Sequence, residues 1–296
     1  MSLNANMKNL SVTVPTRNRP EKLQRCLRAL ARARELFEFE VYVGDSSDEA
    51  ATREAVKTVC EEFEFVHLRH HTGKNVAAAR NFCTQVTAAD LLVSVDDDVY
   101  VEPDAILRLF EAYQRGKGWR VVAGSVAWGE DWSEPVVKRW IGYGRKARPG
   151  EPPSFLVSAF FLYPKALALA LPWNERIRWS DDVFMGALWR SKSVNLLFEP
   201  RARAFHDEQH KSYGVDFQEW HIYENLFDAL LANPNLPRAL AYECLGFAAG
   251  AKTYFRHPKT TQAYVAAWYR GHRALVRDWN YLKALVRRPL PEDKLV

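Results

Sequence analysis

Short apolar runs and longer segments of helical periodicity alternate along the first half of the chain. Apolar runs of strand length lie at residues 10–16, 39–45, 65–70 and 90–95, and each ends in polar residues. The segments between them carry apolar residues at intervals of three and four, and the first of these begins at Pro20. Strands that alternate with helices in this way predict an α/β fold with βαβ units and a mostly parallel central sheet flanked by helices.

The alternation loosens after the fourth predicted helix. Residues 121–128 read as a strand, and residues 129–154 form a Gly/Pro-rich connection of the kind that often makes a mobile loop beside a site. After a further strand and helix, residues 179–192 predict a capped helix. Two short strands ending at His206 are expected to follow it.

Beyond His206 the pattern is helical to the end of the chain. We therefore predict an α/β domain over residues 7–206 and a helical C-terminal region over residues 207–296. Near its end an apolar stripe recurs at alternating steps of four and three: Trp268, His272, Leu275, Trp279, Leu282 and Val286. Such a stripe must be buried, and packing against the first domain or a twin subunit is favoured over contact with an anionic membrane surface.

Basic residues are concentrated in the C-terminal segment. The formal net charge is +5, but the residues from Lys252 onward include ten Lys or Arg against three Asp or Glu. That segment therefore nets +7, and the remainder of the chain nets −2. An apolar content of 48% with 26% charged residues is typical of a soluble globular protein. Pro164 and Lys165 interrupt the most apolar stretch, so no transmembrane helix is predicted.

Four cysteines are widely separated, and none forms a C-x-x-C pair: Cys26, Cys60, Cys83 and Cys244. We expect buried free thiols in a reducing cytoplasm rather than a disulfide framework or a zinc site. The first ten residues lack the apolar segment of a signal peptide. The expected location is therefore cytoplasmic, with peripheral contact at the inner face of the membrane as the alternative.

Polar clusters follow three of the predicted strands, at residues 15–19, 44–48 and 96–98. In a parallel sheet the carboxyl ends of the strands share one edge, so these clusters should converge on one crevice. The third cluster is three consecutive aspartates between apolar residues, and like charges this close require a neutralising cation. Their oxygens suit Mg2+ or Mn2+ bound together with substrate phosphates. An acidic turn with a capping role before Pro103 explains the triplet equally well.

Five segments, in order along the chain, resemble one enzyme family. They read "VTVPTRNRPEKLQRCLRAL", "VYVGDSSD", "NVAAARNFC", "SVDDDVYVEPDAI" and a long run from "VSAFFLYPK" to "RARAFH". Together they resemble the family-2 nucleotide-sugar glycosyltransferases, inverting enzymes of the GT-A fold, over residues 10–206. The chain departs from the family pattern where Gly44 replaces an aspartate, Asn75 a glycine and Asp181 a glutamate.

The resemblance implies a reaction of the hexosyltransferase type with Mn2+ or Mg2+ as cofactor. A sugar would move from a UDP- or dTDP-sugar to a hydroxyl of a glycan, a lipid-linked glycan or a small natural product. No nucleic-acid partner is implied. A homodimer or a peripheral membrane contact would form through the C-terminal helices.

The resemblance also implies a donor site. Asp45 would accept a hydrogen bond from the N3–H of a pyrimidine, although an ordinary Asx turn explains this residue too. The other residues implied to line the nucleoside or to meet the phosphates are Pro15, Thr16, Asn18, Arg19, Lys74, Asn75 and Arg80. The basic members of this set suit surface cations or helix anchors equally well.

Metal ligands are implied in the same way. Asp98 would bind the metal directly, and Asp96 would face both the ribose and the metal. Asp97 would have one or the other of these roles, because the sequence does not fix the direction of its side chain. His206 ends a predicted strand at a position where related enzymes often place a metal-binding histidine. An imidazole among oxygen ligands favours Mn2+ over Mg2+.

The segment "WSDDV" carries the implied catalytic residues. Asp182 corresponds to the family's aspartate that takes the acceptor proton during in-line attack, and Asp181 lies beside it. A structural role explains the same residues, since Ser180 as N-cap and two aspartates in the first turn suit a helix dipole. The two roles are compatible because the start of this helix would face the crevice.

Two other functions compete with sugar transfer. A sugar-nucleotide nucleotidyltransferase would share the fold and the metal, but it normally opens with a glycine-rich basic loop, and "PTRNRP" contains no glycine. A non-catalytic binder of membranes or nucleic acid through the basic tail would leave the ordered carboxylates unexplained.

Overall fold

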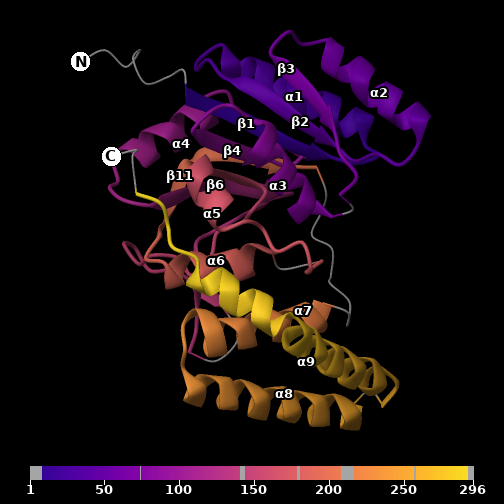
Figure 1. Ribbon diagram of the computed structural model, residues 1–296, viewed down its shortest axis with the longest axis vertical. Helices are drawn as coiled ribbons and strands as arrows, with labels where there is room; N and C mark the ends of the chain where they lie inside the picture. Colours follow the sequence, from indigo (N-terminus) through magenta and orange to yellow (C-terminus); the bar gives the residue numbers. More distant parts are fainter. Residues whose placement is uncertain are drawn as a thin grey trace.

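The fold is built on one nine-stranded sheet, which the computed structural model shows with helices packed around it (Figure 1). The structure describes residues 9–73, 75–140, 144–178, 181–207, 217–256 and 258–292. The strand order is β3-β2-β1-β4-β10-β6-β11-β5, and β7 pairs with β6 outside this path.

The first four strands form a parallel half-sheet, as predicted from the βαβ pattern. They are β1 (Leu10–Thr16), β2 (Glu40–Asp45), β3 (Val66–His70) and β4 (Leu91–Val95). β1 lies between β2 and β4, and β3 is at the edge. Every residue of β1 and β4 is buried, as expected for parallel strands covered on both faces.

Helices connect these strands at the predicted places. They are α1 (Pro20–Arg34), α2 (Ala50–Glu61) and α3 (Val76–Val86). α1 begins at Pro20, with Arg19 as its N-cap residue, because proline suits the first helical turn. The Asn75 side chain caps α3 by accepting a hydrogen bond from the Ala78 N–H at 2.8 Å.

The second half of the sheet is mixed. Its strands are β5 (Val99–Val101), β6 (Arg120–Trp128), β10 (Phe160–Pro164) and β11 (Asn195–His206), with α4 (Ala105–Gln114) between β5 and β6. β10 runs antiparallel to both β4 and β6, whereas β11 is parallel to β6 and antiparallel to β5. The sheet is therefore entirely parallel in its first half and mixed in its second.

One expectation about the strands was wrong. The two short strands predicted to end at His206 form a single strand, β11, whose register with β6 shifts between Glu199 and Arg203. Pro200 lies in this irregular stretch, where the missing N–H of a proline costs no ladder hydrogen bond. The Gly/Pro-rich connection contains β7 (Asp131–Trp132), β8 (Val136–Lys138) and β9 (Gly144–Lys146), the last two paired with each other.

Two hydrophobic clusters lie in the molecule. The first contains buried residues of α1, α2 and α4 together with strands β1, β2 and β4. The second contains buried residues of α5 (Lys165–Ala170) and α6 (Asp181–Ser191), and it extends into the C-terminal helices. The C-terminal region therefore shares a core with the sheet rather than standing apart from it.

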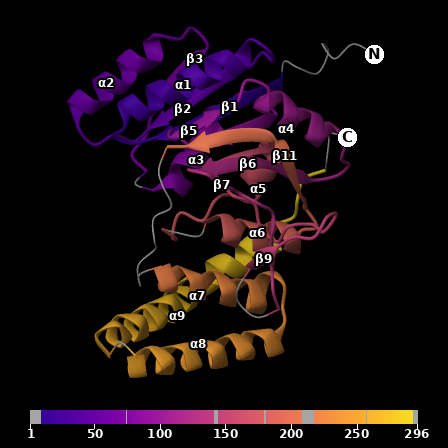
Figure 2. The same cartoon turned by 180° about the vertical axis from the view of Figure 1, so that it is seen from behind.

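The C-terminal region is helical, as predicted. Its elements are α7 (Phe217–Phe227), a π-helical turn η3 (Asp228–Ala232), α8 (Leu236–Arg256) and α9 (Pro258–Arg287). Figure 2 shows α8 and α9 as a hairpin at the end of the molecule opposite α1 and α2. Leu275 and Leu282 of the predicted apolar stripe are buried in the second cluster, with Trp279 and Val286 packed against it. The stripe thus packs on the protein, which was the favoured interpretation.

The cysteines follow the prediction with one exception. Cys26, Cys60 and Cys83 are buried free thiols, and burial raises the pKa of Cys60 and of Cys83 to about 12. Cys244 is exposed on α8, so its expected burial was wrong. Within the described residues, no helix is long and apolar enough to cross a membrane.

Candidate active site

The three polar clusters predicted from the sequence meet at the carboxyl ends of β1, β2 and β4. The Thr16 hydroxyl donates to Asp97 at 2.7 Å, joining the end of β1 to the carboxylate triplet. The Asn18 backbone N–H donates to the Ser47 hydroxyl at 2.9 Å, joining the β1 turn to the β2 turn. Asn18 has a positive φ of 58°, a conformation that asparagine tolerates better than most residues. The predicted convergence of the three clusters is confirmed.

Asp45, at the end of β2, is buried and only partly satisfied. Its Oδ1 accepts from the Ser47 backbone N–H at 2.8 Å and from the Ser47 hydroxyl. Its Oδ2 lies 3.0 Å from His70 Nδ1 but has no aligned hydrogen bond among the described residues. Ser47 and His70 also line a hollow of about 520 Å³. A buried carboxylate oxygen beside a hollow is suited to accept an N–H of a bound group.

Three basic side chains lie close to the Asp98 carboxylate. Arg19 donates to its Oδ2 at 2.8 Å, and the Lys22 ammonium lies 3.4 Å from the same oxygen. His206 Nε2, at the end of β11, lies 3.5 Å from Asp98 Oδ1. The antiparallel pairing of His206 with Val99 places the histidine beside the triplet. The structure therefore brings together Asp98 and His206, two of the three residues expected to bind a metal, whereas the third, Asp96, pairs with Arg80.

These residues fit a divalent cation. Carboxylate oxygens and imidazole nitrogens bind such ions at about 2.0–2.2 Å, so atoms 3.5 Å apart can be ligands of one ion. Among the described residues no group of three His, Cys, Asp or Glu side chains gathers at one point. A cation here would therefore need substrate phosphates or water to complete its coordination.

Asp97 is buried, as Asp98 is, whereas Asp96 is half-buried. Burial raises the pKa of Asp97 to about 7, against the opposing effects of the Thr16 hydrogen bond and of Arg19. Arg19 lies 3.3 Å from Asp97 and also pairs with Asp98, so one guanidinium joins two members of the triplet.

Arg80 of α3 is a buried cation between two carboxylates. It donates to Asp96 Oδ1 at 2.9 Å, to Asp181 Oδ2 and to the Ser158 carbonyl at 3.1 Å. Its guanidinium carbon lies 4.8 Å from the centre of the Trp173 ring. Burial raises the pKa of Asp96, with Arg80 acting in the opposite direction. The structure thus directs Arg80 to Asp96 and Asp181.

The two aspartates at the start of α6 have different surroundings. Asp181 is the counter-ion of Arg80. Asp182 Oδ1 accepts from the Val183 N–H at 2.8 Å, and burial, followed by the charges of Asp181 and Glu224, raises the pKa of Asp182 to about 7. A carboxyl with a pKa near neutrality is suited to exchange protons. Ser180, the expected N-cap, lies outside the described residues.

Several other predicted residues have structural surroundings. Pro15 pairs with Gly44 across β1 and β2, where an added Cβ at position 44 would come within 2.5 Å of Cys83 Sγ. Asn75 caps α3, and its side-chain amide donates to the Glu175 carbonyl at 2.7 Å. Lys74 lies outside the described residues.

Sequence reasoning missed Glu224 of α7. This residue is 2% exposed; its Oε1 lies 3.1 Å from His221 Nδ1, and its Oε2 has no hydrogen-bond partner among the described residues. Phe184, two residues after Asp182, stacks on Phe227 of α7 with ring centres 4.2 Å apart. Nothing in the local sequence indicates that Glu224 lies near Asp182, because α6 and α7 meet only in the folded chain.

Comparisons with known proteins agree with this geometry. A sequence model described as "Glycosyl transferase family 2" matches residues 11–169, which is more than half of the chain. The chain belongs to this family. The carboxylate triplet and Asp45 lie within the matched part, so they belong to its family-2 glycosyltransferase domain.

Curated relatives of this family-2 chain are similar over a shorter region. A validoxylamine A glucosyltransferase of Streptomyces hygroscopicus subsp. jinggangensis (strain 5008) is 32% identical over 117 residues, covering 39% of this chain and 28% of the relative. An N-acetylglucosaminyltransferase of Mesorhizobium japonicum is 35% identical over 111 residues, covering 34% of this chain and 24% of the relative. The matches thus span about a quarter of the length of these relatives.

A solved structure resembles nearly the whole chain. The crystal structure of GalNAc-T7 with UDP, GalNAc and Mn2+ matches with a TM-score of 0.63 at 12% identity, covering 97% of this chain and 60% of the other. At this identity the likeness concerns the fold alone. The GT-A fold expected for a family-2 glycosyltransferase is confirmed.

Proposed function

We propose that this protein transfers a sugar, with inversion, from a nucleotide-diphosphate sugar to an acceptor hydroxyl, with Asp182 as the general base. The observation that carries the proposal is that Arg80 donates both to Asp96 of the triplet and to Asp181, which places the adjacent Asp182 close to the triplet. Burial raises the pKa of Asp182 to about 7. A base with this pKa accepts a proton near neutral pH and still has driving force for the transfer. Asp181 has the separate role of balancing Arg80.

The donor nucleotide is proposed to bind along the ends of β1 and β2. Asp45 Oδ2 accepts the N3–H of uracil or thymine, because this buried oxygen lacks an aligned partner among the described residues. Thr16 and Asn18 border the same site, held by Asp97 and Ser47 respectively. A UDP- or dTDP-sugar suits this arrangement, and the similarly folded GalNAc-T7 was crystallised with UDP.

Metal dependence belongs to the same proposal. Asp98 and His206 hold a Mn2+ or Mg2+ ion, which when bound would neutralise the diphosphate leaving group. Mn2+ is favoured because an imidazole is part of the ligand set. Arg19 and Lys22 border the same carboxylate and offer further positive charge to phosphate.

The two regions of the chain are proposed to have different roles. Residues 7–206 form the catalytic region that binds the donor, and residues 207–296 form a helical region that supports the acceptor side. Glu224 links the two regions, because this carboxylate of α7 contributes to the pKa of the proposed base.

The decisive experiment is a calorimetric titration with UDP, with and without Mn2+. We expect UDP binding to require the metal, and Asp98→Ala to abolish the metal-dependent part. His206→Ala should weaken metal affinity by about 10- to 100-fold. Glu38→Ala changes an exposed carboxylate that pairs with Arg34 and precedes β2, at the end of that strand opposite Asp45, so it should leave binding unchanged. Tight UDP binding by Asp98→Ala in the presence of Mn2+ would contradict the metal assignment.

A further inference from the structure

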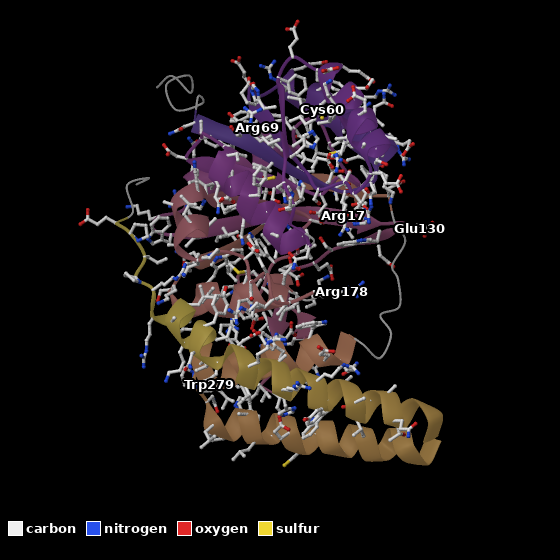
Figure 3. The ribbon with its side chains drawn as sticks, turned by 45° about the vertical axis from the view of Figure 1, so that its right-hand side comes forward. Arg17, Cys60, Arg69, Glu130, Arg178 and Trp279 are labelled. Carbon is white, nitrogen blue, oxygen red and sulfur yellow. The ribbon has the colours of Figure 1, made fainter. Side chains whose placement is uncertain are left out.

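Helix α9 has a second face, on the side away from its buried residues Ala267, Ala274 and Leu285. Val265, Tyr269 and Val276 are 54%, 60% and 74% exposed. Their spacing of four and seven residues places them on one side of the helix. Figure 3 shows α9 across the lower end of the molecule, with Trp279 labelled on it. The apolar side chains of this face are therefore not covered by the rest of the chain.

Unneutralised cations lie on the same side of the helix. Arg273, Lys283 and Arg287 lie three, seven and eleven residues from Val276, and this spacing places them on the same side of the helix as Val276. No ion pair engages these three residues within the described part of the chain. We call Val265, Tyr269, Arg273, Val276, Lys283 and Arg287 the outer face of α9.

Anionic side chains are absent from the outer face. α9 contains a single acidic residue, Asp278, which is fully buried and lies 2.8 Å from Arg176 and 2.9 Å from Arg277. Two of the flanking arginines are neutralised, because Arg277 pairs with Asp278 and Arg270 pairs with Glu219 of α7. The charge of the outer face is therefore positive and exposed to a partner.

We propose that the outer face of α9 is a docking surface for an anionic lipid bilayer. A helix lying in the plane of a membrane inserts apolar side chains among the headgroups while lysines and arginines meet the phosphates. Tyr269 suits this layer because its ring is apolar and its hydroxyl remains wet. The contact is shallow, since only three large apolar side chains take part.

Two other partners fit the outer face less well. A symmetric dimer through this face would oppose Arg273, Lys283 and Arg287 to the same residues of a second copy, which like charges disfavour. A nucleic acid would neutralise the cations but would give Val265 and Val276 no apolar environment. A bilayer satisfies both the charge and the apolar surface.

The test is co-sedimentation of the full-length protein with vesicles of phosphatidylglycerol and phosphatidylcholine in equal parts, and with phosphatidylcholine alone. We expect binding to the anionic vesicles only, and weaker binding as salt screens the cations. Arg273→Gln with Arg287→Gln should weaken it by about 30-fold, since each cation contributes about five- to sixfold. Tyr269→Ser with Val276→Ser should weaken binding several-fold.

The matched control is Arg32→Gln with Arg69→Gln, which removes the same charge from exposed sites in the N-terminal half; Figure 3 labels Arg69 at the end far from Trp279. This variant should bind vesicles as the unchanged protein does. The idea is overturned if the unchanged protein does not sediment, or if the control loses binding equally. A dimer in sedimentation velocity that the outer-face variants abolish would reassign the face to self-association, and equal loss of binding to single-stranded DNA would reassign it to nucleic acid. Mn2+-dependent UDP binding should stay normal in every variant, which separates this test from that of the donor site.

Discussion

Neighbouring side chains of the same type have different chemistry in this crevice. Asp181 and Asp182 are adjacent, but the buried guanidinium of Arg80 pairs with Asp181 only. The pKa of Asp182 is raised instead by burial and by the charges of other carboxylates. From the sequence, both aspartates were predicted as catalytic residues, with Asp182 at the position of the base and Asp181 beside it. Their division of roles depends on Arg80, which comes from α3, and on Glu224, which comes from α7.

Asp182→Asn should retain donor binding and lose transfer. The amide cannot accept the acceptor proton, and removal of a general base commonly costs about 10^2- to 10^4-fold in rate. The measurement is the initial rate of sugar transfer together with the Kd for UDP and Mn2+. Asp181→Asn is the comparison, and it should disturb the Arg80 pair and the stability of the protein more than the proton transfer. Loss of UDP binding in Asp182→Asn would mean that this group is structural.

The pH dependence of transfer should report on Asp182. Because its pKa is raised to about 7 and the base must be ionised, kcat/KM should rise with pH and level off above neutrality. Glu224→Gln removes a nearby negative charge, so the pKa of Asp182 should fall and the midpoint should move to lower pH. Glu219→Gln, on the same helix but paired with Arg270, should leave the midpoint in place. An unchanged midpoint in Glu224→Gln would show that this carboxylate does not act on the base.

At the scale of elements, periodicity predicted the strands and helices better than their junctions. The β-branched runs that became β1, β2 and β4 are buried, so their pattern was unambiguous. β11 was predicted as two strands because Pro200 normally ends one. The sheet instead continues past the proline with a shifted register, which only the pairing with β6 reveals. Cys244 was predicted to be buried because free cysteines usually are, but it is exposed on α8.

The two faces of α9 should differ in their contribution to stability. Leu282 is fully buried in the second cluster, so Leu282→Ala should lower the free energy of unfolding by about 2–5 kcal/mol. Val276, on the outer face of the same helix, makes a matched control, and Val276→Ala should change stability by no more than about 0.5 kcal/mol. Urea denaturation followed by circular dichroism measures both. Equal losses would contradict the assignment of the two faces.

At the scale of the whole molecule, the sequence predicted the architecture and the location of the site. The three polar clusters converge because the carboxyl ends of parallel strands share an edge, a rule that needs no knowledge of side-chain contacts. The contacts that set the chemistry could not be predicted, since they join distant parts of the chain. Lys138 of β8, for example, is buried and donates to Asn225 of α7 at 2.6 Å. Burial lowers the pKa of Lys138, with Glu224 acting in the opposite direction.

The position of Arg80 has a consequence for how the chain folds during synthesis. One of its carboxylates, Asp96, is 16 residues away, but the other, Asp181, is 101 residues away. A nascent chain that has emerged only as far as β4 would bury this cation with a single counter-ion, which is costly in an apolar setting. The first half-sheet therefore gains its full stability only after α6 has been made. A chain that ends before α6 would lack one of the two counter-ions of Arg80, so the contact between α3 and α6 forms late in translation.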